Sequence, residues 1–115
     1  MALSRIVMRL ARNPGTEFAD GDDHRGYTLT ANLGADGKLD AANAKGAAVR
    51  RFAPDDDVEE GALKVRGGHW SFDFDGDVMN VPHLGDHAFT VGEYVSLPDD
   101  DGRLLAYKVT EVTPL

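Results

Sequence analysis

Residues 62–81, ALKVRGGHWSFDFDGDVMNV, carry the strongest structural signal in the chain. Apolar and polar residues alternate along this segment, and two glycine-containing pairs interrupt it, Gly67-Gly68 and Asp75-Gly76. A period of two is typical of antiparallel strands with one buried face, and both pairs suit two-residue turns in which φ is positive. The segment therefore predicts two consecutive tight hairpins.

Counting outward from the two turns gives the register of the three strands. Apolar residues then face one another in four pairs: Val65 with Trp70, Leu63 with Phe72, Phe72 with Met79, and Trp70 with Val81. All of them lie on one face. A slip by one residue would turn Trp70, Phe72 and Phe74 out to water together, so we expect this register to be strongly preferred.

Further strands are expected on both sides of this meander. The segments that read as strands are 4–11, 27–33, 47–53, 93–97 and 105–109. The last two form a hairpin around residues 99–103, in which Gly102 takes a positive φ and Leu97 faces Leu105. In the same register Val95 faces Tyr107, so the apolar faces of this hairpin coincide as well.

Two segments have sequence patterns that are compatible with a helix. Residues 4–11 match a short helical stripe, but adjacent β-branched Ile6 and Val7 and the following Asn-Pro-Gly favour a strand. Residues 41–44 are expected to form a single helical turn, because Asp40 precedes this alanine-rich run and a glycine follows it.

These elements predict an all-β fold, a small antiparallel sheet or barrel, strongly bent, with about seven or eight short strands and one short helical turn. The length of 115 residues is that of one ordinary domain, and no linker interrupts it, so residues 1–115 are expected to form a single all-β domain. Residues 14–26 are expected to form a long acidic loop, either mobile or functional.

Composition excludes several classes of function. The chain has no cysteine, which excludes thiol nucleophiles, disulfides and cysteine-ligated metals. The net charge of -8 opposes nonspecific attraction to nucleic acid and to anionic lipid. No stretch approaches the length of a membrane span, and residues 1–11 lack the apolar core of a signal peptide. We therefore expect a cytoplasmic protein that does not bind membranes.

Five residues form the candidate ligand site. The register of the first hairpin places Arg66 across from His69 and Lys64 across from Ser71 on the outward face. If the strand that carries Arg50 and Arg51 lies alongside, four cations gather beside His69 and would suit an anion, a nucleotide or RNA. The alternative is that these are solvated outward positions whose charges balance the nearby acids, as is usual for a one-sided sheet.

Metal sites are the weaker alternatives. His83, Asp86 and His87 would suit a divalent metal if they converged, and the protein would then be a metal-dependent enzyme or a metal carrier. The neighbouring proline and glycine favour a loop over a helix, however, and the glutamate of the helical zinc motif is missing. The closely spaced acids at residues 20–24 and 73–77 do not match a twelve-residue calcium loop. We therefore expect no bound metal and no cofactor.

Residues 89–97, FTVGEYVSL, resemble the strand segment F-x-P-G-Q-Y-V-x-L of the flavin-binding barrels in ferredoxin-reductase-like proteins. The likeness covers nine residues. The Arg-x-Tyr-Ser type of motif that follows in that family has no counterpart here, so neither flavin nor any site residue is carried over.

Nothing in the sequence indicates catalysis. No serine, histidine and acid can be assembled into a triad from their spacing, and the glycines do not have the spacing of a phosphate-binding loop. The leading hypothesis is therefore a small non-enzymatic module that binds a protein partner through its sheet surface and the acidic 14–26 loop. This hypothesis predicts an edge strand or an exposed apolar patch.

Overall fold

The computed structural model describes residues 2–99 and 101–115. The described residues form one antiparallel sheet of eight strands and two short 3-10 helices. In chain order the elements are β1 (Ala2–Leu10), β2 (Asp22–Leu33), η1 (Ala41–Asn43), β3 (Ala48–Ala53), β4 (Asp56–Arg66), β5 (His69–Phe74), β6 (Asp77–Val81), η2 (Leu84–Asp86), β7 (Tyr94–Pro98) and β8 (Leu104–Pro114).

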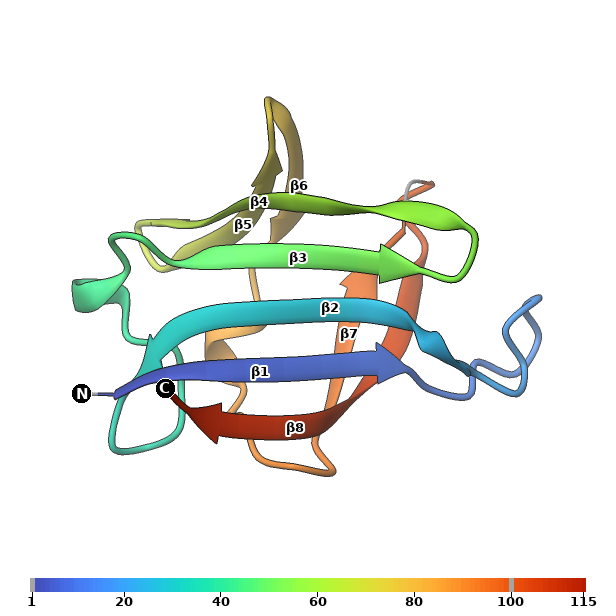
Figure 1. Cartoon of the computed structure of the whole chain (residues 1–115), viewed down its shortest axis with the longest axis horizontal. Coiled ribbons are helices and arrows are strands. Elements are labelled where there is room, and N and C mark those ends of the chain that lie inside the picture. Colours follow the sequence, from blue (N-terminus) through green and yellow to red (C-terminus); the bar gives the residue numbers. More distant parts are fainter. Residues whose placement is uncertain (1, 100) are drawn as a thin grey trace.

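The sheet curls into a nearly closed barrel. Its strand order is β6-β5-β4-β3-β2-β1-β8-β7, and each neighbouring pair is antiparallel. The two end strands, β6 and β7, approach each other, but within the described residues no ladder of hydrogen bonds joins them. Figure 1 shows β1 to β4 side by side, with β7 passing behind them. The predicted all-β fold class is confirmed.

The register predicted for the meander is confirmed at all four apolar pairs. The two turns have positive φ, 59° and 81° at Gly67 and Gly68, and 56° and 93° at Asp75 and Gly76. Because one turn with the wrong geometry would have shifted a strand by a residue, this agreement shows that turn chemistry and burial specify the same pairing.

The predictions for the remaining short elements also agree with the structure. The pairs Leu97 with Leu105 and Val95 with Tyr107 form in the β7–β8 hairpin. Residues 4–11 belong to a strand, β1, apart from the last of them. The helical turn is the 3-10 helix η1, whose Asp40 side chain accepts a hydrogen bond from the backbone N–H of Ala42 at 3.1 Å.

Two strands begin earlier than the sequence indicated. β2 starts at Asp22, so the end of the expected 14–26 loop is strand, and β4 starts at Asp56 within an acidic run. A bulge of β1 against β2, between Arg9 and Leu10, accommodates the extra residues of β2. Both strand ends project beyond the hydrophobic core, so their inward side chains are polar and the alternation that marks a half-buried strand is absent there.

The core fills the barrel from one end. The largest fully buried side chains are Tyr27, Phe72, Ile6, Met8, Leu29, Leu97, Val49, Val95 and Val109. Where β5 begins, Leu84 of η2 is buried and Gly85 lies so close to Trp70 that a Cβ would stand 2.7 Å from its indole nitrogen. That end is therefore packed with apolar groups, whereas polar side chains line the opposite end.

Candidate functional site

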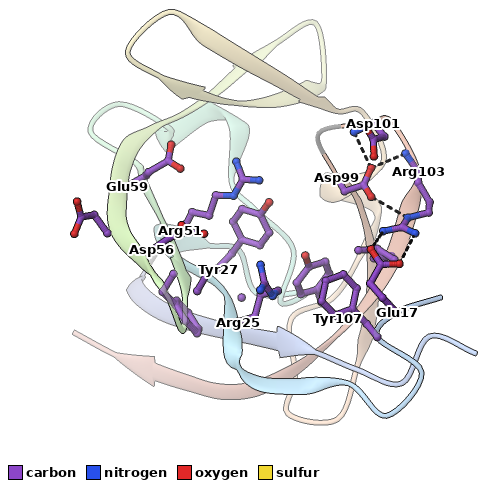
Figure 2. A pocket seen from close by; sticks show the side chains of 16 residues that line it. Glu17, Arg25, Tyr27, Arg51, Asp56, Glu59, Asp99, Asp101, Arg103 and Tyr107 are labelled. Carbon is purple, nitrogen blue, oxygen red and sulfur yellow. Dashed lines mark hydrogen bonds and ion pairs between the residues drawn. The ribbon is translucent and has the colours of Figure 1, made fainter.

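A polar cavity of about 280 Å³ opens at the end of the barrel where β3 ends and where β2, β4 and β8 begin. We call this opening the barrel mouth. The loop of residues 11–21 and the turn between β7 and β8 form one side of it, and the start of β4 forms another. Figure 2 shows the side chains that line it.

Two tyrosines, Tyr27 of β2 and Tyr107 of β8, form the floor of the mouth. They are 1% and 5% exposed, and their rings meet edge to face with centroids 5.4 Å apart. The Tyr27 hydroxyl donates a hydrogen bond to Sδ of Met79 at 3.8 Å. No hydrogen bond within the described part of the chain involves the Tyr107 hydroxyl, although this residue lines the cavity. The hydroxyl is not among the buried polar atoms without a partner, so it is open to the cavity and offers a ligand a polar group that no described residue uses.

The Tyr107 hydroxyl has charges of both signs around it. Burial raises its pKa, and Tyr27 and Asp99 raise it further, whereas the charges of Arg51 and Arg25 lower it. The hydroxyl is therefore protonated at neutral pH and can donate one hydrogen bond to a ligand. Both arginines line the same cavity as this hydroxyl.

The two arginines come from neighbouring strands. Arg51 of β3 pairs with Tyr27 of β2, and its guanidinium carbon lies 5.9 Å from the centroid of that ring. Arg25 stacks over Phe18 at 5.0 Å; its buried Nε, 3.7 Å from Oδ2 of Asp22, forms no hydrogen bond within the described residues. Figure 2 shows both guanidinium groups directed into the mouth. Each guanidinium has five N–H donors, so donors remain for a ligand even where one partner is present.

A cluster centred on Arg103 joins the turn between β7 and β8 to the 11–21 loop. Nη1 and Nη2 of Arg103 donate to the two carboxylate oxygens of Glu17 at 2.9 and 2.8 Å, and Nε donates to Oδ2 of Asp99 at 2.9 Å. Bidentate pairing of this kind fixes geometry as well as distance. We call these three side chains the Arg103 clamp; they form one wall of the mouth.

Asn13 holds the base of the same loop. Its Nδ2 donates to the carbonyl oxygen of Ala106 at 3.2 Å, and its Oδ1 accepts from the N–H of Ala106 at 2.8 Å. The side-chain amide thus imitates one more residue of a strand beside β8. Together with the clamp, these bonds attach the loop to the barrel at two points.

The clamp predicts an unusual titration of Glu17. The hydrogen bonds from Arg103 lower the pKa of this carboxyl from its ordinary 4.5 to about 2. The clamp therefore favours the folded state fully above pH 4.5, and this contribution is lost as the pH falls towards 2. A carbon NMR titration should show a midpoint near 2 in the wild type and a clearly higher one, shifted towards 4.5, in Arg103→Ala, where only the backbone hydrogen bond of Glu17 still lowers the pKa. Arg5→Ala, which removes a loose 4.0 Å pair with Glu111, is the control and should leave the midpoint of Glu17 unchanged. An equally low midpoint in Arg103→Ala would contradict the clamp.

The outer part of the mouth is acidic. Four carboxylates line it without an ion pair to any other described residue, and we call them the acidic rim: Asp56, Asp57, Glu59 and Asp101. Figure 2 places Asp56 and Glu59 on the side opposite Asp101. Anionic groups therefore flank the entrance on two sides, above a floor that carries two guanidinium groups.

The five residues proposed from the sequence as an anion site do not form one cluster. Arg66 and His69 pair across the first turn, both exposed, as the predicted register requires. Lys64 donates to Oδ2 of Asp73 at 2.8 Å on the same outer face. Arg50 also lies on the outside, with Nη2 2.6 Å from Oε1 of its cross-strand neighbour Glu60.

Arg51 is separated from the other four, because consecutive residues of a strand point to opposite faces and Arg51 points into the barrel. Arg66 lies six residues along β4 from Glu60, the partner of Arg50, which is about 20 Å at the rise of a strand. The structure therefore brings Arg66 and His69 together and places Arg51 in the mouth.

The histidine pair proposed as a metal site lies around η2. His83 Nδ1 is 3.4 Å from Oδ2 of Asp86, and both side chains are largely exposed. In the described residues no group of three or more histidine or acidic side chains is arranged to hold a metal ion.

Comparison with protein-family models, with curated proteins and with solved structures found no match to this chain. Within the described residues no helix is long and apolar enough to cross a membrane.

Sequence reasoning missed most of the mouth. One signal was available. Side chains alternate between the two faces of a strand, so Arg51 lies on the same face of β3 as Val49, which is buried. Tyr107 was placed inward from its pairing with Val95, but nothing local indicates that its hydroxyl opens into a cavity. Arg25 falls in a segment read as loop, so its side chain could not be assigned a direction.

Proposed function

We propose that this protein is a non-enzymatic binding barrel that holds a small molecule in its mouth. The observation that carries the proposal is the Tyr107 hydroxyl, which reaches the cavity from an otherwise buried residue and makes no hydrogen bond within the described residues. A hydroxyl that is open to a cavity and has no protein partner can donate a hydrogen bond to a bound molecule. A ligand with an acceptor group at this point would use that donor.

The size and lining of the cavity support binding. At about 280 Å³ it lies at the small end of the range for ligand pockets, and it combines aromatic rings with a few convergent polar groups. The lining includes no histidine, cysteine or serine, so it lacks a histidine base and a cysteine or serine nucleophile. The tyrosines and arginines offer hydrogen bonds and charge, which are sufficient for recognition.

A comparison of two tyrosine variants tests this proposal. The labelled protein is titrated with a panel of amino acids, amines, carboxylates, phosphates and sugars, and proton–nitrogen correlation spectra report the residues affected. We expect shifts at mouth residues such as Gly26, Ala53 and Leu105. Tyr107→Phe keeps the ring but removes the hydroxyl, and should weaken binding about tenfold to a hundredfold, as for a hydrogen bond to a charged group.

The matched control is Tyr94→Phe, because Tyr94 lies on the outside of β7 and is 56% exposed. It should bind as the wild type does. If no compound of the panel shifts the mouth resonances, or if both variants weaken binding equally, the mouth is not the binding site.

Binding of a protein partner remains a second proposal, which the two end strands of the sheet favour. Counting outward from the Asp75-Gly76 turn, the backbone N–H and C=O groups of Val78 and Asn80 in β6 point away from β5. Such unpaired edges can add a strand from another chain. Line broadening confined to β6 and β7 on addition of cell extract would support this proposal, and its absence would argue against it.

A further inference from the structure

Charge is arranged in two layers along the axis of the barrel mouth. At the floor, Arg25 and Arg51 are half-buried and line the cavity together with Tyr107, whereas the carboxylates of the acidic rim are exposed. At the entrance, the acidic rim presents four carboxylates without ion pairs to other described residues. A ligand that descends into the mouth therefore passes a negative layer before it reaches a positive one.

Neither a simple anion nor a simple cation satisfies both layers. An anion at the floor gains from Arg25 and Tyr107 but is repelled at the rim, and a cation at the rim leaves the Tyr107 hydroxyl without an acceptor. Like charges brought together at a binding interface are strongly unfavourable, and complementary ones fix the orientation of a ligand. A molecule with a negative group at one end and a positive group nearby matches the arrangement.

We propose that the ligand is a small zwitterion of the α-amino acid type, with its carboxylate at Tyr107 and Arg25 and its ammonium group towards the acidic rim. This assignment rests on the proposed binding function of the mouth. Arg51, which lies over the ring of Tyr27 at the floor, adds positive charge there and is assigned no direct contact with the ligand. The Phe18 ring, which lines the cavity under Arg25, provides an apolar surface for the side chain of the ligand.

Three related probes separate the charges of the ligand. L-Phenylalanine carries both charges, N-acetyl-L-phenylalanine keeps the carboxylate alone, and L-phenylalaninamide keeps the ammonium group alone. Each is titrated into the labelled full chain and followed at the mouth resonances. We expect phenylalanine to bind at least about tenfold more tightly than either blocked compound, because each loses one complementary charge.

Two variants assign each charge to its layer. Arg25→Gln should weaken binding of phenylalanine and of the N-acetyl compound about tenfold while leaving the amide within about twofold. Glu59→Gln in the rim should weaken phenylalanine and the amide and spare the N-acetyl compound. Arg66→Gln, on the exposed first turn of the meander, is the control and should change none of the three.

The outcomes distinguish the class of ligand from the existence of the site. Tighter binding of either blocked compound, or equal effects of the two variants on all three probes, would overturn the zwitterion. Binding at the mouth by other members of the panel but by none of the three probes would also overturn it, with the binding function intact. No binding by any compound would overturn both proposals.

Discussion

Phe72→Ala is expected to lower the free energy of unfolding by about 3–5 kcal/mol, the usual cost of removing a large aromatic ring from a core. The Phe72 side chain is fully buried, in the middle of β5. Its ring packs against Tyr27 with centroids 5.3 Å apart and against Phe74 at 6.3 Å. Because Tyr27 is held by β2 across the barrel and Phe74 by β5 itself, the cavity left behind cannot close fully.

Urea unfolding followed by tryptophan fluorescence would measure this loss, since the single Trp70 lies on the same strand. The control is Val78→Ala, which truncates an apolar residue on the outer face of the adjacent strand, where Val78 is 53% exposed. Its effect should stay within about 0.5 kcal/mol. Equal losses in the two variants would contradict the register that separates the faces of the meander.

The meander could be predicted because two independent features agree there. Positive φ at both turns restricts the loops, and alternation restricts which face is buried, so few registers satisfy both. The β7–β8 hairpin was predictable for the same reason, with Gly102 at a φ of 80°. Local sequence suffices where the turn and the apolar pattern lie within about twenty residues of each other.

The mouth could not be predicted because its contacts join distant parts of the chain. Asn13 and Ala106 are separated by 93 positions, and Glu17 and Arg103 by 86. Their residue types are ordinary for loops, and no periodic pattern relates them. The anion hypothesis also failed to anticipate that Arg50 and Arg51 diverge, because the facing of residues 47–53 was ambiguous until the pairing with β2 was known.

At the start of β2, charged side chains obscure the sequence pattern of a strand. Residues 22–26 contain acids, a histidine and an arginine, which together read as loop, yet they pair with the end of β1 through a bulge. Apolar and polar residues alternate along a strand only where one of its faces is buried. At the mouth the inward face of β2 is exposed to solvent, so the alternation is absent. Strand pairing there depends on backbone geometry, above all on Gly26.

Gly26→Ala is expected to cost at least about 3 kcal/mol of stability, at the upper end of the range for overpacking. A Cβ at this position would stand 1.9 Å from the carbonyl oxygen of Met8 and 3.0 Å from Cα of Arg9. Both are backbone atoms of β1 and cannot rotate away. The strands must therefore separate at the bulge, where glycine allows the close approach.

The same change should damage the mouth, because Gly26 lies between Arg25 and the floor residue Tyr27. Urea unfolding of Gly26→Ala measures the first effect, and the tyrosine region of the near-ultraviolet circular dichroism spectrum reports the second. Gly34→Ala is the matched control. Its only tight contact would be with the side-chain Oδ1 of Asp36 at 3.0 Å, on an exposed residue that can move, and its distance of 3.8 Å to the carbonyl oxygen of Lys38 is an ordinary contact. That variant should remain within about 1 kcal/mol of the wild type, the scale on which such a change also restricts the unfolded chain. Equal stability of Gly26→Ala and Gly34→Ala would mean that β1 and β2 do not pair as closely as the bulge requires. The positions of Arg25 and Tyr27 in the mouth would then also be wrong.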